Sequence, residues 1–198
     1  MNLITSAITF MRKKGYILFL GIFLISCRST QKTTKNIAQN FELEQIKIFA
    51  TEQWNYVAKK IPAGKEELYG FQDQNEIAHA TMGTPIRMFF WKENNIIESQ
   101  IYRVPVMVEE KMVSLLTVSS GEKMSVEDFG GSVLIKAIQE ISEKNEVKPY
   151  GILRVHPISS DFYIINENDD LNYILISPNP ADRKKITFEE LRKIINKE

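Results

Sequence analysis

The first 26 residues decide how much of this chain is left to fold. A basic cluster, Arg12–Lys14, precedes an apolar run from Tyr16 to Ile25. That run is about half of the roughly 20 residues that a membrane-spanning helix needs. A positive segment, a short apolar segment and then the small residue Ser26 are typical of a secretory signal peptide. We therefore expect residues 1–26 to be removed, so that the fold is built from the remainder.

The end of this segment, Leu24-Ile25-Ser26-Cys27, resembles the lipobox of bacterial lipoproteins. In that family the cysteine thiol is diacylated and cleavage follows directly before it. The resemblance implies that Cys27 carries diacylglyceryl and N-acyl groups, such as palmitate, and that two or more chains hold the protein stably on a membrane. Cys27 is the only cysteine, so it has no intramolecular disulfide partner.

Two features near the segment refine this expectation. In lipoproteins of enteric-type bacteria, an aspartate after the modified cysteine favours the inner membrane. Arg28 stands there, so the resemblance implies the outer membrane of the cell envelope rather than the inner one. Met11 directly precedes the basic cluster, as in a typical signal peptide, so translation from Met11 is an alternative to Met1.

Composition suggests three parts: the signal peptide (1–26), a lipidated cysteine with a flexible tether (27–39) and one globular domain (40–198). The tether is rich in Ser, Thr, Gln, Lys and Asn and has almost nothing to bury. Three of the 25 basic residues and none of the 25 acidic residues precede Cys27. The mature chain is therefore slightly acidic, which argues against nucleic-acid binding.

Three helices are expected in the domain, and the ambiguous stretch from Leu68 to Gly83 leaves a short helix around Glu76 to Ala80 open. Apolar residues recur every three or four positions from about Phe41 to Lys60, which indicates an amphipathic helix. A second helix is expected from about Ser132 to Lys144. A third opens at Thr187, where Glu190 stands three residues later and completes a capping box.

Short apolar runs separated by turn residues predict strands between these helices. Hairpin-length connections indicate an α+β fold with a mostly antiparallel sheet of about five to seven strands and helices packed on one face. The order is similar to that of profilin-like or roadblock-like domains, with a cystatin-like fold as the alternative. The expected strands are residues 86–91, 100–108, 112–118, 124–126, 151–155, 162–166 and 172–176.

A second resemblance concerns the globular part. The segments Arg103–Val106, Ser114–Val118 and Val126–Gly131, the last placed before a helix, resemble a pattern in uncharacterised extracytoplasmic bacterial proteins. Arg154-Val155, followed by Asp161-Phe162, continues the pattern. Those proteins have no known activity, so the resemblance implies no function and no site residues.

Candidate catalytic chemistry is sparse. The chain has two histidines, His79 and His156, which excludes a multi-histidine metal site. His156 and Asp161 could form an orienting pair for a base, but no nucleophile stands at a recognisable position. We therefore predict no catalytic residues, no metal ligands and no cofactor.

Aromatic residues give the second candidate site. Phe89, Phe90 and Trp91 follow one another in an expected strand, so Phe90 points opposite to its two neighbours. Burial of that strand on both sides is the simpler interpretation. The alternative is a ligand or partner surface, because exposed aromatic patches usually bind something. The residues expected to form it are Trp54, Phe89, Trp91 and Tyr102.

These observations favour a lipid-anchored binding or interaction module of the cell envelope without catalytic activity. It would meet an envelope protein or a small ligand. Two alternatives stay open: an envelope hydrolase that uses His156 and Asp161, and a cystatin-like protease inhibitor or propeptide-like module.

Overall fold

The computed structural model describes residues 39–146, 149–168 and 170–197. The predicted signal peptide, Cys27 and nearly all of the predicted tether lie outside these residues. The chain divides into two units, Met1–Glu42 and Leu43–Glu198, and the second contains the whole of the described sheet. None of the described helices is long and apolar enough to cross a membrane.

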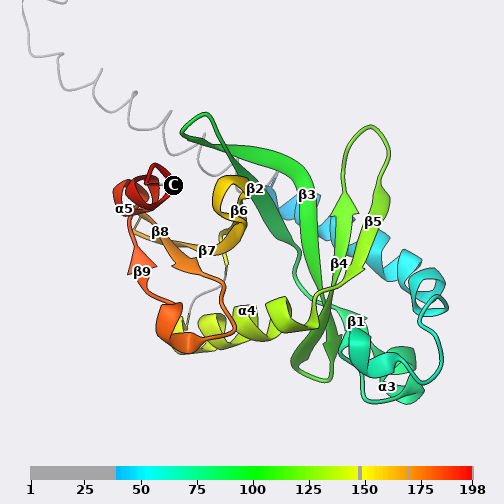
Figure 1. Cartoon of the computed structure of the whole chain (residues 1–198). Helices are drawn as coiled ribbons and strands as arrows, with labels where there is room; N and C mark the ends of the chain where they lie inside the picture. The colour runs from blue at the N-terminus through cyan, green and yellow to red at the C-terminus, as the bar shows by residue number, and fades with distance from the viewer. Residues whose placement is uncertain (1–38, 147–148, 169, 198) are drawn as a thin grey trace, which may run out of the picture. The chain divides into compact units, whose positions relative to one another are not determined.

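A single mixed sheet of nine strands forms the centre of the second unit, counted over the described residues (Figure 1). The strand order is β5-β4-β3-β2-β6-β7-β8-β9, and β1 pairs with β3. The bonded neighbours are antiparallel except β2 and β6, which are parallel. This confirms the prediction of an α+β fold with a mostly antiparallel sheet. The strands are β1 (Thr81–Met82), β2 (Ile86–Lys92), β3 (Asn95–Val108), β4 (Lys111–Ser119), β5 (Ser125–Gly130), β6 (Gly151–Val155), β7 (Ser160–Glu167), β8 (Asp170–Leu175) and β9 (Lys185–Ile186).

Four α-helices accompany the sheet within the described residues. They are the helix over residues 39–58, α3 (Gln74–His79), α4 (Ser132–Asn145) and α5 (Phe188–Ile195). Short 3₁₀ turns lie at η1 (Glu66–Tyr69), η2 (His156–Ile158) and η3 (Pro180–Asp182). The predicted capping box at the start of α5 is present: Glu190 N–H donates to the Thr187 hydroxyl, and Thr187 N–H donates to the Glu190 carboxylate.

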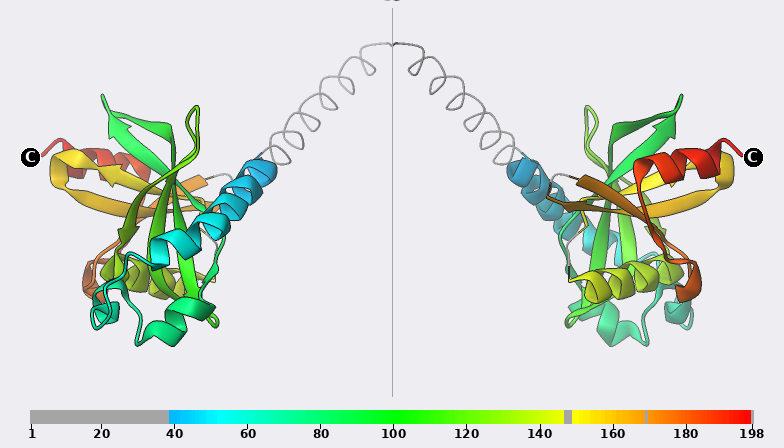
Figure 2. Two further views of the ribbon diagram at one scale, coloured as in Figure 1. Left: turned by 90° about the vertical axis from the view of Figure 1, so that its right-hand side faces the viewer. Right: turned by 90° about the vertical axis from the view of Figure 1, so that its left-hand side faces the viewer.

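Helices cover both faces of the sheet (Figure 2). On one face, here called the α4 face, Leu115, Ile152 and Tyr163 pack with Ile135 and Ile138 of α4. The opposite face packs against two helices. The part of the first helix that belongs to the second unit, residues 43–58, covers Val104, Leu116 and Val118, and α5 covers Leu153, Phe162 and Ile164. The prediction that the helices share one face is therefore wrong, because alternating strand residues are apolar on both sides.

The expected strand count was too low and the helix order matches only loosely. The two additional strands, β1 and β9, have two residues each, too few for an alternating pattern to be visible in the sequence. The short helix α3 lies between the expected N-terminal and central helices. It begins at a recognisable cap, because the Asp73 carboxylate accepts a hydrogen bond from Glu76 N–H.

Candidate functional site

The α4 face of the sheet is covered only in part. Helix α4 crosses one end of the strands, and the same strands continue beyond it (Figure 1). Residues opposite one another on neighbouring strands share a face, so the strand register identifies the side chains in this uncovered part. We call it the open strip. Its residues are Phe90, Ile97, Arg103, Ser119, Asp128, Arg154 and Asp161. Thr117, which is 6 % exposed, and Ile101, which packs against the cluster beneath α4, form its border.

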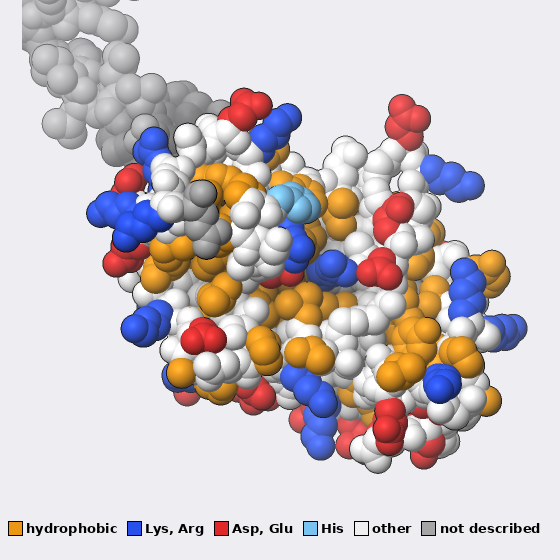
Figure 3. Space-filling model, in the orientation of Figure 1, with side chains coloured by type: hydrophobic (Ala, Val, Ile, Leu, Met, Phe, Trp, Pro, Cys, Tyr) orange, Lys and Arg blue, Asp and Glu red, His pale blue; other side chains and the backbone are white. Residues whose placement is uncertain are grey.

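Charged side chains gather in the open strip, beside a histidine (Figure 3). Arg154 and Asp161 are register partners on β6 and β7, and Arg154 Nη1 lies 3.0 Å from Asp161 Oδ2. The Asp161 side chain is 12 % exposed and that of Arg154 is 35 % exposed. This ion pair is therefore shielded on its acidic side and reachable on its basic side.

A second arginine lies across the strip on β3. Arg103 Nη1 donates to the Thr117 hydroxyl oxygen of β4 and lies 4.0 Å from Asp128 Oδ2 of β5. The three residues form one row of the register across the three strands. Asp128 is 71 % exposed, so solvent weakens its hold on the guanidinium. Arg103 is therefore the less neutralised of the two arginines.

Two polar atoms of the strip lack a partner within the described residues. Arg103 Nε and Asp161 Oδ1 are buried and make no hydrogen bond there. Buried polar groups in native proteins are nearly always paired, so each such atom indicates a strained or incomplete polar arrangement. The hydrogen-bonding capacity of the strip is thus not fully satisfied by the described protein.

An aromatic pair flanks the Arg154–Asp161 pair. Phe90 is the register partner of Arg154. Its ring stacks on the His156 ring, with centroids 5.8 Å apart and planes 10° from parallel. His156 opens η2 directly after β6, and the residue is exposed. The strip therefore offers a partly exposed flat ring pair next to a guanidinium group.

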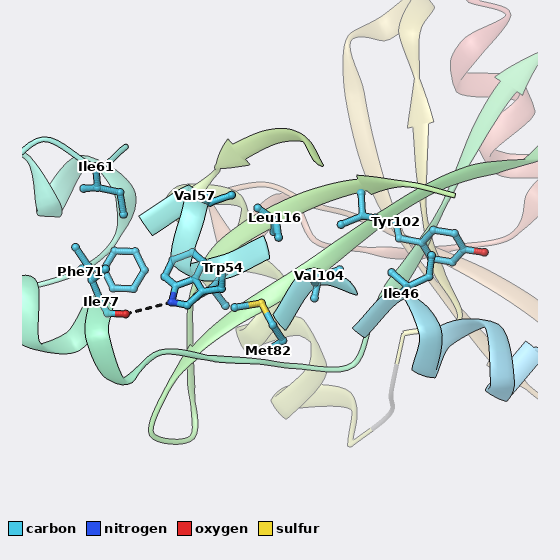
Figure 4. Packing of buried hydrophobic residues seen from close by; sticks show 13 residues of the cluster. Ile46, Trp54, Val57, Ile61, Phe71, Ile77, Met82, Tyr102, Val104 and Leu116 are labelled. Carbon is cyan, nitrogen blue, oxygen red and sulfur yellow. Dashed lines mark hydrogen bonds between the residues drawn. The ribbon is translucent and has the colours of Figure 1, made fainter. Parts of the chain in front are cut away.

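The four aromatic residues expected to bind a ligand belong to the core instead. Trp54, Phe89, Trp91 and Tyr102 are between 0 and 7 % exposed. Trp54 contacts the rings of Phe71 and Phe129. Its Nε1–H donates to the Ile77 carbonyl oxygen (Figure 4). The alternation expected within strand 86–91 is present, because Phe89 and Trp91 pack with α5 on the opposite face while Phe90 lies in the open strip.

The proposed His156–Asp161 pair does not form among the described contacts. The carboxylate of Asp161 pairs with Arg154, and the imidazole of His156 stacks on Phe90. His79 lies at the end of α3, where its Nδ1 is 2.8 Å from the Asn75 carbonyl oxygen. No group of three or more His, Cys, Asp or Glu side chains within residues 39–146, 149–168 and 170–197 is placed to hold a metal ion.

Of the charged residues in the strip, the sequence indicated Asp161 as a candidate site residue, whereas Arg103 and Arg154 were named only within a resemblance that implies no site. Arg103 stands between Tyr102 and Val104, and Arg154 stands between Leu153 and Val155. An arginine inside an apolar strand signals a sheet face that is open on its side, because an unpaired buried charge is too costly. That signal was available in the sequence. The distance between the two arginines along the chain hid their common face.

Comparison with protein-family models, with curated proteins and with solved structures finds no match to this chain.

Proposed function

We propose that this protein is a lipid-anchored binding module of the bacterial cell envelope, without catalytic activity. It holds an anionic ligand, or an acidic surface of an envelope protein, on the open strip. The observation that carries the proposal is the part of the sheet that α4 leaves uncovered, with Arg103 and Arg154 next to the Phe90–His156 ring pair.

The chemistry of the strip favours an anion. Guanidinium groups bind carboxylates and phosphates through paired, charge-assisted hydrogen bonds. Arg154 keeps about a third of its side chain exposed while its own acidic partner is shielded. A ring pair at its side suits a flat or partly apolar ligand. A carboxylate-bearing cell-wall fragment would offer such an anionic group to the arginines. The slightly acidic mature chain argues against nucleic acid.

The anchor belongs to the same proposal. Acylation of Cys27 would fix the module to a membrane, with the outer membrane favoured over the inner one, and residues 28–39 would act as the tether. The domain would then need no membrane-binding surface of its own. Metabolic labelling with a palmitate analogue tests this part, because label should enter the chain and be lost in Cys27→Ala.

The finer fold assignment and the alternative functions are also proposals. The profilin-like or roadblock-like order remains our preferred description, with the cystatin-like one as the alternative. The hydrolase alternative loses support because the Asp161 carboxylate is engaged by Arg154. No observation specifically favours a protease inhibitor.

Thermal unfolding of the purified full-length chain tests ligand binding. Peptidoglycan fragments with free carboxylates are compared with the same fragments amidated. A ligand at a hundred times its dissociation constant adds about 2.7 kcal/mol to the free energy of unfolding. We expect the melting temperature to rise with the acidic fragments, and the rise to be lost in Arg154→Gln and Arg103→Gln but kept in Arg192→Gln on α5. Equal shifts with amidated fragments, or unchanged shifts in the two strip variants, would contradict the proposal.

A further inference from the structure

A groove of about 600 Å³ lies between the helix over residues 39–58 and the start of β5. It is separate from the open strip: Val126 is the register partner of Val118, which packs on the opposite face of the sheet. One wall is helical and the other is the β4–β5 hairpin. Its apolar surface comes from Phe49, Val57, Met124 and Val126.

The strand that forms one wall is the edge of the sheet. β5 is the first strand of the sheet order and pairs only with β4 among the described strands. Farther along β5, the Asp128 carboxylate accepts a hydrogen bond from Phe129 N–H at 2.8 Å and so caps that part of the edge. The residues at the groove, Ser125–Glu127, come before this cap. An edge strand with free backbone groups is a template for one more strand.

The charges that line the groove have one sign. Lys60 stands on the helical wall and Lys123 on the hairpin wall, and no acidic side chain lines the groove within the described residues. The Glu127 carboxylate lies beside the groove and accepts a hydrogen bond from the Ser125 hydroxyl. Lys60 Nζ lies 4.4 Å from the ring centroid of Tyr56, which is 63 % exposed at the rim. This cation–π contact holds one ammonium group at the mouth of the groove.

We propose that this groove binds an extended, acidic segment of a partner protein, which adds to the sheet at Ser125–Glu127. Side chains of an extended segment alternate, so the set that faces the groove would pack on Phe49 and Val57. The ammonium groups of Lys60 and Lys123 would attract the acidic residues of the segment to the groove. The charges indicate the occupant. Both walls carry a positive charge, so the groove attracts an acidic strand and repels a basic one. The inference is independent of the ligand of the open strip and of the lipid anchor.

Fluorescence anisotropy with the purified full-length chain tests the proposal. The probe is a labelled eight-residue peptide of alternating glutamate and valine, compared with one of alternating lysine and valine. We expect the acidic peptide to bind about tenfold more tightly or better, with an affinity that falls as salt rises. In Lys60→Glu/Lys123→Glu this preference should reverse, so that the basic peptide binds the more tightly.

A matched control is Lys111→Glu/Lys136→Glu, which changes the net charge equally at two exposed lysines away from the groove. It should leave the preference for the acidic peptide unchanged. Hydrogen exchange adds a structural readout, because amides of Ser125–Glu127 should exchange more slowly with the acidic peptide bound. All four charge-reversed lysines are exposed, so both double variants should keep the melting temperature of the parent.

Three outcomes would overturn the proposal. One is equal affinity for the acidic and basic peptides. Another is an unchanged preference in Lys60→Glu/Lys123→Glu. The last is a dimer of the full-length chain that this double variant converts to monomers while the acidic peptide does not compete with dimerisation, which would make a second copy the occupant.

Discussion

The α4 face of the sheet has two halves that are built from the same strands but differ in composition. Beneath α4 the inward side chains are apolar and essentially inaccessible, as at Leu115 and Ile152. Two residues further along the same strands, the side chains are Thr117 and Arg154. Within each of these two strands, the positions that the helix covers are therefore apolar, whereas the positions beyond the helix are polar or charged.

The largest effect should separate these two halves by stability. Ile138 of α4 is fully buried in the covered half, whereas Ile97 in the open strip is 46 % exposed. We expect Ile138→Ala to lower the free energy of unfolding by about 2–5 kcal/mol, because it leaves a cavity. Ile97→Ala should cost less than about 0.5 kcal/mol. Urea titration measures both, and a comparable cost at Ile97 would mean that the open strip is packed rather than free.

A second substitution tests packing on the opposite face of the sheet, where Leu153 and Val155 of β6 are buried in the cluster that contains α5. Gly151 lies beneath the Phe89 ring, and a β-carbon there would stand 2.3 Å from Phe89 Cε2. We expect Gly151→Ala to cost about 1–3 kcal/mol by overpacking. Gly121→Ala is the control, since its nearest neighbour would be 3.6 Å away. In a double-mutant cycle, Phe89→Leu should recover part of the loss, and strict additivity would contradict this explanation.

A third pair of variants asks what an ion pair contributes in the strip. Removing the cation in Arg154→Gln leaves a carboxylate that is 12 % exposed, and we expect a loss of about 1–3 kcal/mol. In the exposed pair Lys185–Glu167 the side chains are 44 and 37 % exposed, and Lys185→Gln should cost about 0.5 kcal/mol or less. Chemical denaturation of both variants is the measurement. Equal losses would show that the strip is as well solvated as the rest of the surface.

The smallest expected effect concerns alkaline pH and the covered half. Burial raises the pKa of Tyr163 above its usual value, and a hydrogen bond with Ser142 lowers it in part. Between the pKa of the unfolded chain, about 10, and the raised folded value, only the unfolded state ionises. The contribution of Tyr163 to the free energy of unfolding should therefore be fully present below pH 10 and decrease as the pH rises above it. Tyr163→Phe should make the overall fall in stability shallower, with the remainder due to Tyr173, whose pKa burial also raises. An identical pH profile in the variant would refute the assignment.

Local sequence patterns predicted many of the helices and strands. Periodicity located α4, the capping residues Thr187 and Glu190 located α5, and alternation located the longer strands. The two-residue strands β1 and β9 have no pattern of their own and exist only through pairing with β3 and β8. Whether helices cover one face or both also depends on contacts between distant segments, which explains the error there.

The site was harder to predict than the fold for the same reason. The large aromatic residues Trp91 and Tyr102 were expected at a binding surface, but both are buried in the core, where their rings remove much apolar area from water. Phe90 and Arg154 become neighbours only when β2 pairs with β6. No local signal in the sequence reports that pairing, so the arginines within apolar strands indicate an open face but not which residues share it.

The parallel contact of β2 with β6 also has a consequence for how the chain folds. It is the one link between a meander of β2 to β5 and a second meander of β6 to β9 within the described sheet. Each meander forms from pairings between strands close in sequence, whereas Met88 must find Ile152 across the whole of β3 to α4. Contacts of such long range pay their loop-closure entropy late. We expect two rapidly formed hairpin assemblies whose joining at this seam limits the refolding rate.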